Sequence, residues 1–172
     1  MCVKDLIWDL NERLSKEISL STASILQLAV VIGADSQHVR VTYQSRVDLA
    51  MRAAQMLADS IVEIWGVPVV NSGFEMPPGN VRTGSGRTLI EMLEKDSFDE
   101  QKAAAEYLRL ASAAGTAGLN GIKARLMTLA RRKNVLAIQI KRIGVNQPAT
   151  AQPVLRLIDK KAAGLRSSGL EL

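Results

Sequence analysis

Apolar residues recur at three- and four-residue spacing through most of this 172-residue chain, and no other feature restricts its fold as strongly. Leu6, Leu10 and Leu14 illustrate the pattern, with charged residues on the opposite side of the segment. This is the period of an amphipathic helix that turns one face to a core. Helices are predicted over residues 4–18, 21–32, 45–64, 88–95, 97–114 and 119–129. The expected fold class is mainly α, a helical bundle-like single domain.

Local capping signals set the expected helix boundaries. Ser21 and Thr22 can cap a helix that stops at Gly33. Ser97 followed by Glu100 has the spacing of a capping box and predicts that a new helix starts there.

Two short segments also fit a β-strand. Val39, Val41 and Tyr43 alternate with other residues within 38–43. Residues 137–141 fit a strand and a helix equally well. We therefore allow one small two-stranded β element, around 38–43 and 135–141, in an otherwise helical chain.

Proline and glycine divide the chain. Residues 66–86 contain three Pro and five Gly, which predicts a long loop rather than a helix or a central strand. Pro148 and Pro153 set off the C-terminal part, in which a short helix is expected. The predicted organisation is a single domain over 1–147, followed by a Pro-delimited helix and tail over 148–172.

Charge is distributed unevenly along the sequence. Residues 1–106 hold ten Lys and Arg against fifteen Asp and Glu, a net charge of −5. Residues 107–172 hold twelve against two, a net charge of +10, and the stretch 107–158 contains no acidic residue. A basic region of this kind attracts polyanions.

This basic region predicts a nucleic-acid-binding protein that contacts the phosphate backbone without strong sequence specificity. The opposite charges of the two halves predict self-association, as in a homo-oligomeric subunit of a nucleoprotein assembly. The sequence does not distinguish DNA from RNA. The predicted contact residues are Arg109, Lys123, Arg125, Arg131, Arg132, Lys133, Lys141 and Arg142, with Arg82 and Arg87, in and beside the glycine-rich loop, as secondary candidates.

Two other interpretations of these charges stay open. In one, the cations pair within the fold with acidic residues such as Asp96, Asp99 and Glu100, so that the two halves neutralise each other. In the other, the chain is a structural assembly subunit, a coat or complex component, whose basic half binds an acidic protein surface.

Residues 25–45 resemble a helix-turn-helix motif. Ala29, Gly33 and Val39 have the four- and six-residue spacings of that motif, and Arg40 would then face the major groove. The resemblance implies a DNA-binding regulator as a further alternative.

Residues 81–88, VRTGSGRT, resemble a phosphate-binding loop. Arg87 stands where that motif has lysine, and no clear strand leads into the segment. An anion site at a helix N-terminus, or a plain glycine-rich turn, is the simpler interpretation.

The chain lacks the residues of common catalytic and metal sites. One histidine, His38, and one cysteine, Cys2, are too few for the usual zinc or Cys-His constellations. We expect no enzyme activity, no metal and no cofactor. The lone cysteine fits a reducing compartment, and the longest apolar run is too short for a membrane span. The expected location is the cytoplasm or the inside of a virion.

Overall fold

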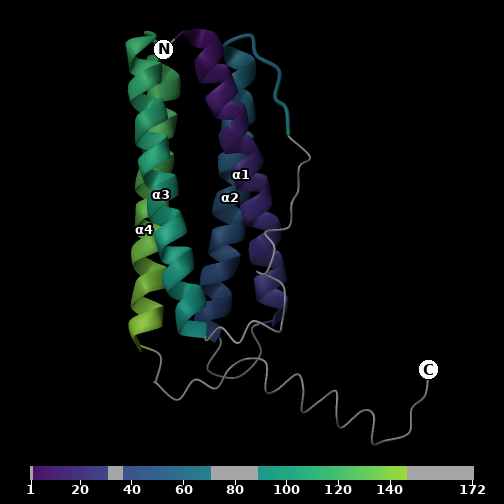
Figure 1. Ribbon diagram of the computed structural model, residues 1–172, viewed down its shortest axis with the longest axis vertical. Coiled ribbons are helices and arrows are strands. Elements are labelled where there is room, and N and C mark those ends of the chain that lie inside the picture. The colour runs from purple at the N-terminus through teal and green to yellow at the C-terminus, as the bar shows by residue number, and fades with distance from the viewer. Residues whose placement is uncertain (1, 31–36, 71–88, 147–172) are drawn as a thin grey trace, which may run out of the picture.

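The computed structural model describes residues 2–30, 37–70 and 89–146, which contain four long helices (Figure 1). They are α1 (Val3–Val30), α2 (Gln37–Glu63), α3 (Leu89–Thr116) and α4 (Asn120–Asn146). Each has 27 or 28 residues and is therefore about 40 Å long. The prediction of a mainly helical bundle is confirmed. The predicted β element is wrong, because the described part of the chain contains no strand.

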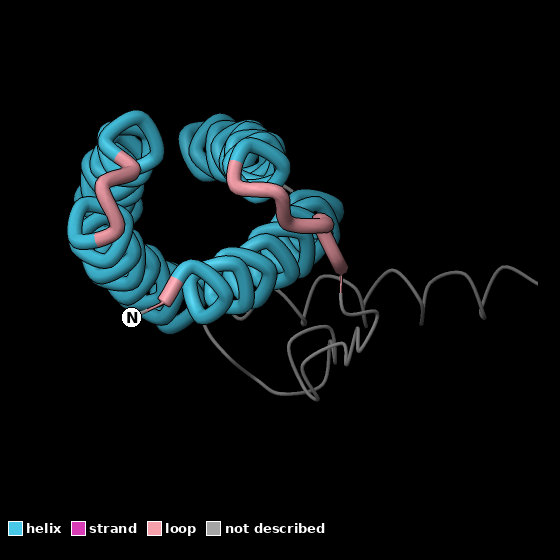
Figure 2. The backbone as a smooth tube through the Cα atoms, turned by 90° about the horizontal axis from the view of Figure 1, so that it is seen from above, coloured by secondary structure: helices cyan, strands magenta, loops and turns pink. Residues whose placement is uncertain are grey.

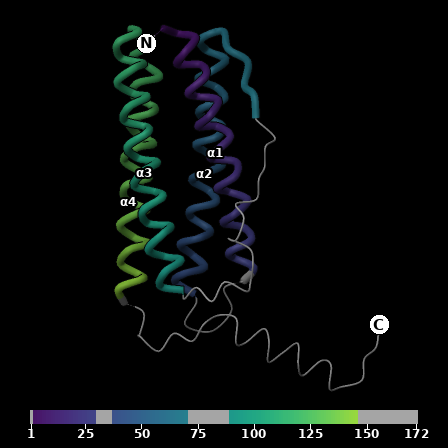
Figure 3. The backbone as a smooth tube through the Cα atoms, viewed as in Figure 1, coloured from purple at the N-terminus to yellow at the C-terminus, as the bar shows by residue number. Residues whose placement is uncertain are grey.

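The helices form two antiparallel hairpins, α1 with α2 and α3 with α4 (Figures 1 and 3). Helix α2 ends where α1 begins, whereas α3 begins at the opposite end of the bundle, so the chain crosses the length of the molecule between them. Across the hairpins, α2 packs on α4 and α1 packs on α3, and all four helices surround one core (Figure 2). This is a four-helix bundle with one long crossover connection.

Helix α2 contains the first predicted strand. Val39 and Tyr43 are both buried, and they are four residues apart on one helical face. Val41, between them, is 61% exposed. Residues four positions apart lie on the same side of a strand and also on the same side of a helix, so the positions of Val39 and Tyr43 fit both structures. Packing of this segment against the bundle favours the helix, and this packing overrides the β propensity of valine.

The second predicted strand lies within α4. Leu136, Ala137 and Ile140 are buried at the spacing of one helical face. The strand interpretation of residues 135–141 is wrong because these residues fill the core from a helix.

The helix-turn-helix prediction for residues 25–45 is also wrong. Its first part belongs to the 28-residue α1 and its second part to the 27-residue α2. Both are full-length members of the bundle, and Val39 of the supposed recognition helix lies in the core.

Two predicted helix boundaries fall inside longer helices. The Ser21 hydroxyl donates to the carbonyl of Ile18 at 2.8 Å, so α1 continues past it. The Ser97 hydroxyl donates to the carbonyl of Ala137 in α4 at 2.9 Å, within the uninterrupted α3. Serine can satisfy its hydroxyl inside a helix as well as at a cap, which explains both errors.

The core consists of two apolar clusters that follow each other along the bundle. The larger cluster draws on all four helices and includes Leu10, Leu57 and Leu110. The smaller cluster, nearer the end where α2 begins, contains Val39, Tyr43, Leu93, Leu136 and Ile140. On α4 the two clusters are separated by the turn of helix between Ala130 and Leu136.

Helix α2 ends in a Schellman motif. The amide of Gly66 donates to the carbonyl of Ile61 at 2.8 Å, and the amide of Trp65 donates to the carbonyl of Val62 at 3.0 Å. Trp65 occupies the left-handed position with φ of 61°, and its side chain is 96% exposed. A residue with a Cβ is strained in this conformation, which glycine usually takes.

The remaining predicted segments lie outside the described residues. These are positions 71–88, which include Arg82, Arg87 and the VRTGSGRT segment, and the C-terminal helix and tail over 148–172. Among the helices that are described, none is long and apolar enough to cross a membrane.

We expect Trp65→Gly to stabilise the protein by about 1 kcal/mol, because it removes left-handed strain and the lost side chain makes few contacts. Urea unfolding followed by circular dichroism measures the change. The matched control is Trp8→Gly, which places glycine inside α1 and should destabilise. Destabilisation by both variants would contradict the strain at Trp65.

Candidate functional site

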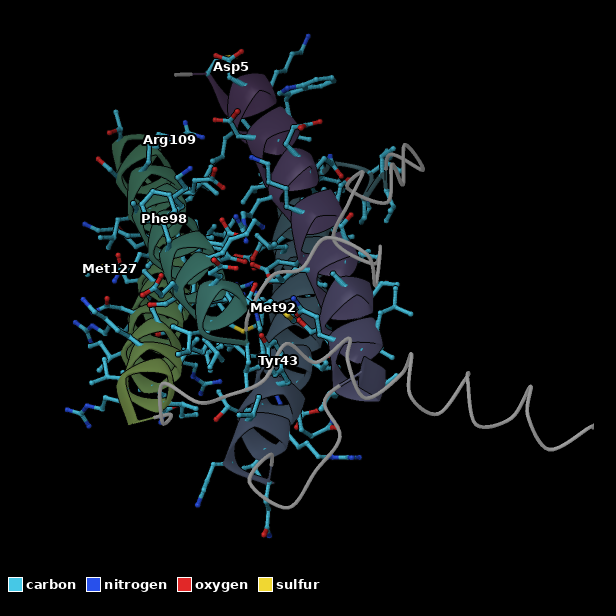
Figure 4. All side chains as sticks on the ribbon, turned by 60° about the horizontal axis from the view of Figure 1, so that its bottom comes forward. Asp5, Tyr43, Met92, Phe98, Arg109 and Met127 are labelled. Carbon is cyan, nitrogen blue, oxygen red and sulfur yellow. The ribbon has the colours of Figure 1, made fainter. Side chains whose placement is uncertain are left out.

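Six charged side chains lie buried midway along the bundle, between the two apolar clusters. Every helix contributes at least one, and none exposes more than 6% of its surface. Figure 4 shows nitrogen- and oxygen-bearing side chains reaching into the space between the helices. The six are Arg13 and Glu17 of α1, Arg46 of α2, Asp96 and Glu100 of α3, and Lys133 of α4. We call this group the ion-pair cluster.

Lys133 is the centre of the ion-pair cluster. Its Nζ lies 2.9 Å from Oε2 of Glu17 and 3.0 Å from Oε2 of Glu100. All three side chains are fully buried. One ammonium group therefore joins two carboxylates that come from different helices, and it ties α4 to both α1 and α3.

Arg46 extends the cluster on the side of α2. Its Nε donates to Oε1 of Glu100 at 2.7 Å, and its Nη1 lies 2.9 Å from Oδ1 of Asp96. The other oxygen of Asp96 accepts hydrogen bonds from the Tyr43 hydroxyl and from Nε2 of Gln27. Both carboxylates thus hold Arg46 with charge-assisted bonds, which are stronger than neutral ones.

Arg13 extends the cluster towards the surface on the side of α1. Its Nε donates to Oε1 of Glu17 at 3.1 Å, and its Nη1 donates to Oε2 of Glu106 at 2.7 Å. The Tyr107 hydroxyl donates to the same Oε1 of Glu17 at 2.9 Å. The Arg13 guanidinium also lies 5.0 Å from the centre of the Tyr107 ring, a cation–π distance.

The buried charges change the pKa values of their neighbours. Burial alone would raise the pKa of Glu17, but Lys133 and Arg13 outweigh it, so the pKa of Glu17 is lowered. Burial raises the pKa of Tyr107, and the charge of Glu17 adds to the effect. Burial raises the pKa of Tyr43 as well, together with the charge of Asp96. The two tyrosines therefore remain protonated and donate to the carboxylates of Asp96 and Glu17.

Sequence reasoning named Asp96 and Glu100 only as acidic residues that could pair with the basic half, and it placed Lys133 among the surface contacts, so the cluster itself was missed. The missed signal is that some charged residues stand at positions where the helical spacing places a buried apolar residue. Lys133 follows Leu126 and Leu129 at spacings of three and four residues, and Glu17 follows Leu10 and Leu14 at spacings of four and three. A charge in core phase is buried with the stripe and needs a partner there.

Three of the predicted nucleic-acid contacts pair with acidic side chains of this chain. Lys133 is buried, and Arg109 pairs with Asp9 at 2.8 Å. Arg125 pairs with Glu63 across α2 and α4. The remaining predicted residues of α4 are exposed and make no ion pair with another described residue: Lys123, Arg131, Arg132, Lys141 and Arg142.

Two open grooves lie beside these exposed cations. Arg131 and Arg132 border a groove of about 320 Å³ between α2 and α4, together with Leu49 and Val135. Lys123 borders a groove of about 510 Å³ between α3 and α4. Arg131 and Arg132 thus border one groove and Lys123 borders the other.

The described residues offer no ready metal site. Within 2–30, 37–70 and 89–146, no group of three His, Cys, Asp or Glu side chains is placed to hold a metal ion. The three carboxylates of the ion-pair cluster are each bonded to at least one buried cation. His38 is exposed near the start of α2, far along the helix from Arg46.

Comparison with known proteins gives a fold likeness. No protein-family model matches the sequence, and neither does any curated protein. One similar solved structure is the crystal structure of ferritin-like, diiron-carboxylate proteins from Bacillus anthracis str. Ames. The TM-score is 0.69 at 22% sequence identity, over 83% of this chain and 99% of that one. This chain therefore has the ferritin-like four-helix fold, in agreement with its single crossover connection.

The prediction of a nucleic-acid-binding subunit of a nucleoprotein assembly is wrong. The fold is similar to that of a solved structure described as ferritin-like, diiron-carboxylate proteins, and Lys133, Arg109 and Arg125 pair with acidic side chains of this chain. The basic half is also not wholly available to an acidic protein surface, because Arg109, Arg125 and Lys133 pair with acidic side chains of the same chain. The structure instead contains internal pairs between the two halves, among them Glu100 with Lys133, Asp9 with Arg109, and Glu63 with Arg125.

We expect Glu17→Gln to destabilise the protein by about 3–5 kcal/mol at pH 7, because it leaves Lys133 and Arg13 undercompensated in the interior. Between neutral and acid pH, the free energy of unfolding of the variant should also fall less than that of the wild type. The folded pKa of Glu17 lies below its unfolded value of about 4.3, so its contribution is present above that pH and is lost as the pH falls through the folded pKa. Urea unfolding between neutral and acid pH measures both effects.

The matched control is Glu94→Gln on the exposed side of α3. It should change the stability by less than about 0.5 kcal/mol. An equal loss in the two variants, or an unchanged acid response in Glu17→Gln, would contradict the role given to Glu17.

Proposed function

We propose that this chain is a metal-independent, non-enzymatic member of the ferritin-like fold. The observation that carries the proposal is Lys133, whose ammonium joins Glu17 and Glu100 at the centre of the bundle. In this view the ion-pair cluster replaces a dimetal centre as the group that holds the four helices together.

The likeness to a diiron-carboxylate protein makes a dimetal centre the first function to consider. Such bundles take one Glu from each of two helices and a Glu-x-x-His motif from each of the other two. This sequence contains one histidine, so it cannot supply two such motifs. Helix α4 contains no Asp, Glu, His or Cys at all. The residues of this chain therefore do not fit a dimetal centre.

The charge balance of the cluster supports the same conclusion. Its six buried side chains are three cations and three anions. A divalent ion added to this neutral group would face Lys133, Arg13 and Arg46 at close range. Electrostatic repulsion in the low-dielectric interior opposes its entry.

Iron storage and oxidase chemistry, the roles that the fold alone suggests, are thus not proposed for this chain. Because the ion-pair cluster occupies the centre of the bundle, we propose that ligands bind on the outer surface, where the grooves beside Lys123 and Arg131 lie. We also propose a cytoplasmic location, which is supported by the single, unpaired Cys2.

The experiment is metal analysis of protein purified from iron-supplemented cells, together with an Fe²⁺ oxidation assay. We expect no stoichiometric iron, no oxidation above the buffer rate, and the same Tm with and without chelator, because a ligand raises Tm only if it binds the folded state. Stoichiometric iron with a chelator-sensitive Tm would contradict the metal-independent function. Oxidation of Fe²⁺ above the buffer rate would contradict the non-enzymatic one.

A further inference from the structure

Building on the metal-independent function, we propose that Lys133 is the residue that closes the bundle centre to metal. A change of this one side chain to a carboxylate would turn the ion-pair cluster into a binding site for one divalent cation. The ligand class is a hard divalent ion with oxygen ligands, such as Mn²⁺.

Geometry supports the position of the site. Lys133 Nζ lies 2.9 Å from Glu17 Oε2 and 3.0 Å from Glu100 Oε2, between carboxylates that approach from α1 and α3. A bound divalent ion needs oxygen distances of about 2.0–2.6 Å, so the two carboxylates would have to close in by less than 1 Å each. A carboxylate from α4 would be the third ligand.

The outer carboxylate oxygens are already fixed. Arg13 holds Oε1 of Glu17, and Arg46 holds Oε1 of Glu100. These bonds orient the two Oε2 atoms towards Lys133. Partners of this kind, one step behind the ligands, are what keep ligand side chains in place in metal sites.

The charge count supports the same position. The ion-pair cluster now has three cations and three anions. Lys133→Glu leaves two cations and four anions, a net charge of −2 in a buried group. An uncompensated buried charge is strongly unfavourable, and one divalent ion restores neutrality. Metal binding by this variant should therefore be coupled to folding.

The donor set indicates which metal to use. The three ligands of Lys133→Glu are all carboxylates, which suit Mg²⁺, Ca²⁺ or Mn²⁺ better than the softer transition ions. Mn²⁺ is the useful probe because its free aqueous electron paramagnetic resonance signal weakens on binding.

The experiment compares the full-length wild-type chain with Lys133→Glu, with and without Mn²⁺, by thermal unfolding and Mn²⁺ resonance titration. The matched control is Lys141→Glu, the same charge change at an exposed position of α4. We expect Lys133→Glu to bind one Mn²⁺ per chain and to gain several degrees of Tm, or to fold only when Mn²⁺ is present. The wild type and Lys141→Glu should bind none in the bundle and keep their Tm.

A Lys133→Glu variant that folds equally well in chelator and in Mn²⁺, and binds none, would overturn the inference. If it folds in neither condition, Lys133→Gln decides, because it leaves a net charge of only −1 with Glu17 and Glu100 still in place. Weak Mn²⁺ binding by folded Lys133→Gln supports the inference, and no binding overturns it. Mn²⁺ in the wild-type bundle would instead contradict the metal-independent function, so the two failures are distinguishable.

Discussion

The contact of one buried ammonium with two buried carboxylates, Lys133 with Glu17 and Glu100, is the interaction on which the centre of this bundle depends. A lone charge in such a position would be strongly unfavourable. Here each charge has partners on neighbouring helices, and further contacts through Arg13 and Arg46 continue the chain of ion pairs across the bundle. The arrangement fixes which residues face each other, because a helix shifted along its axis would leave a buried charge unpaired.

The helix alignment that the ion pairs fix complements the apolar core rather than replacing it. The two apolar clusters are built mostly from Leu, Ile and Ala, whose shapes tolerate small shifts in helix position. The ion-pair cluster between them is fully paired in only one alignment of the four helices. It also occupies the middle of the four helices, the region where bundles of this architecture build metal sites from facing side chains. The same residues thus align the helices and occupy this region with paired charges.

Sequence periodicity was sufficient for the helical bundle, because the buried residues repeat at three and four positions. It failed where a local signal agreed with two structures. Val39 and Tyr43 lie on one face in a strand and also in a helix, and Ser97 can bond at a cap or across to α4. The prediction of function failed for another reason. The number of charges along the chain does not show which cations face the interior of the bundle. Internal pairing with Glu100 was one of the alternatives that the sequence left open, and the tertiary structure identifies Lys133 as the partner because α3 and α4 pack together.

The most direct test of the central claim is a crystal structure of the wild-type protein from crystals soaked in Mn²⁺, with anomalous diffraction data. The account predicts continuous density for the Lys133 side chain between Glu17 and Glu100, and no anomalous peak inside the bundle. An anomalous peak between these carboxylates, with Lys133 displaced, would contradict it.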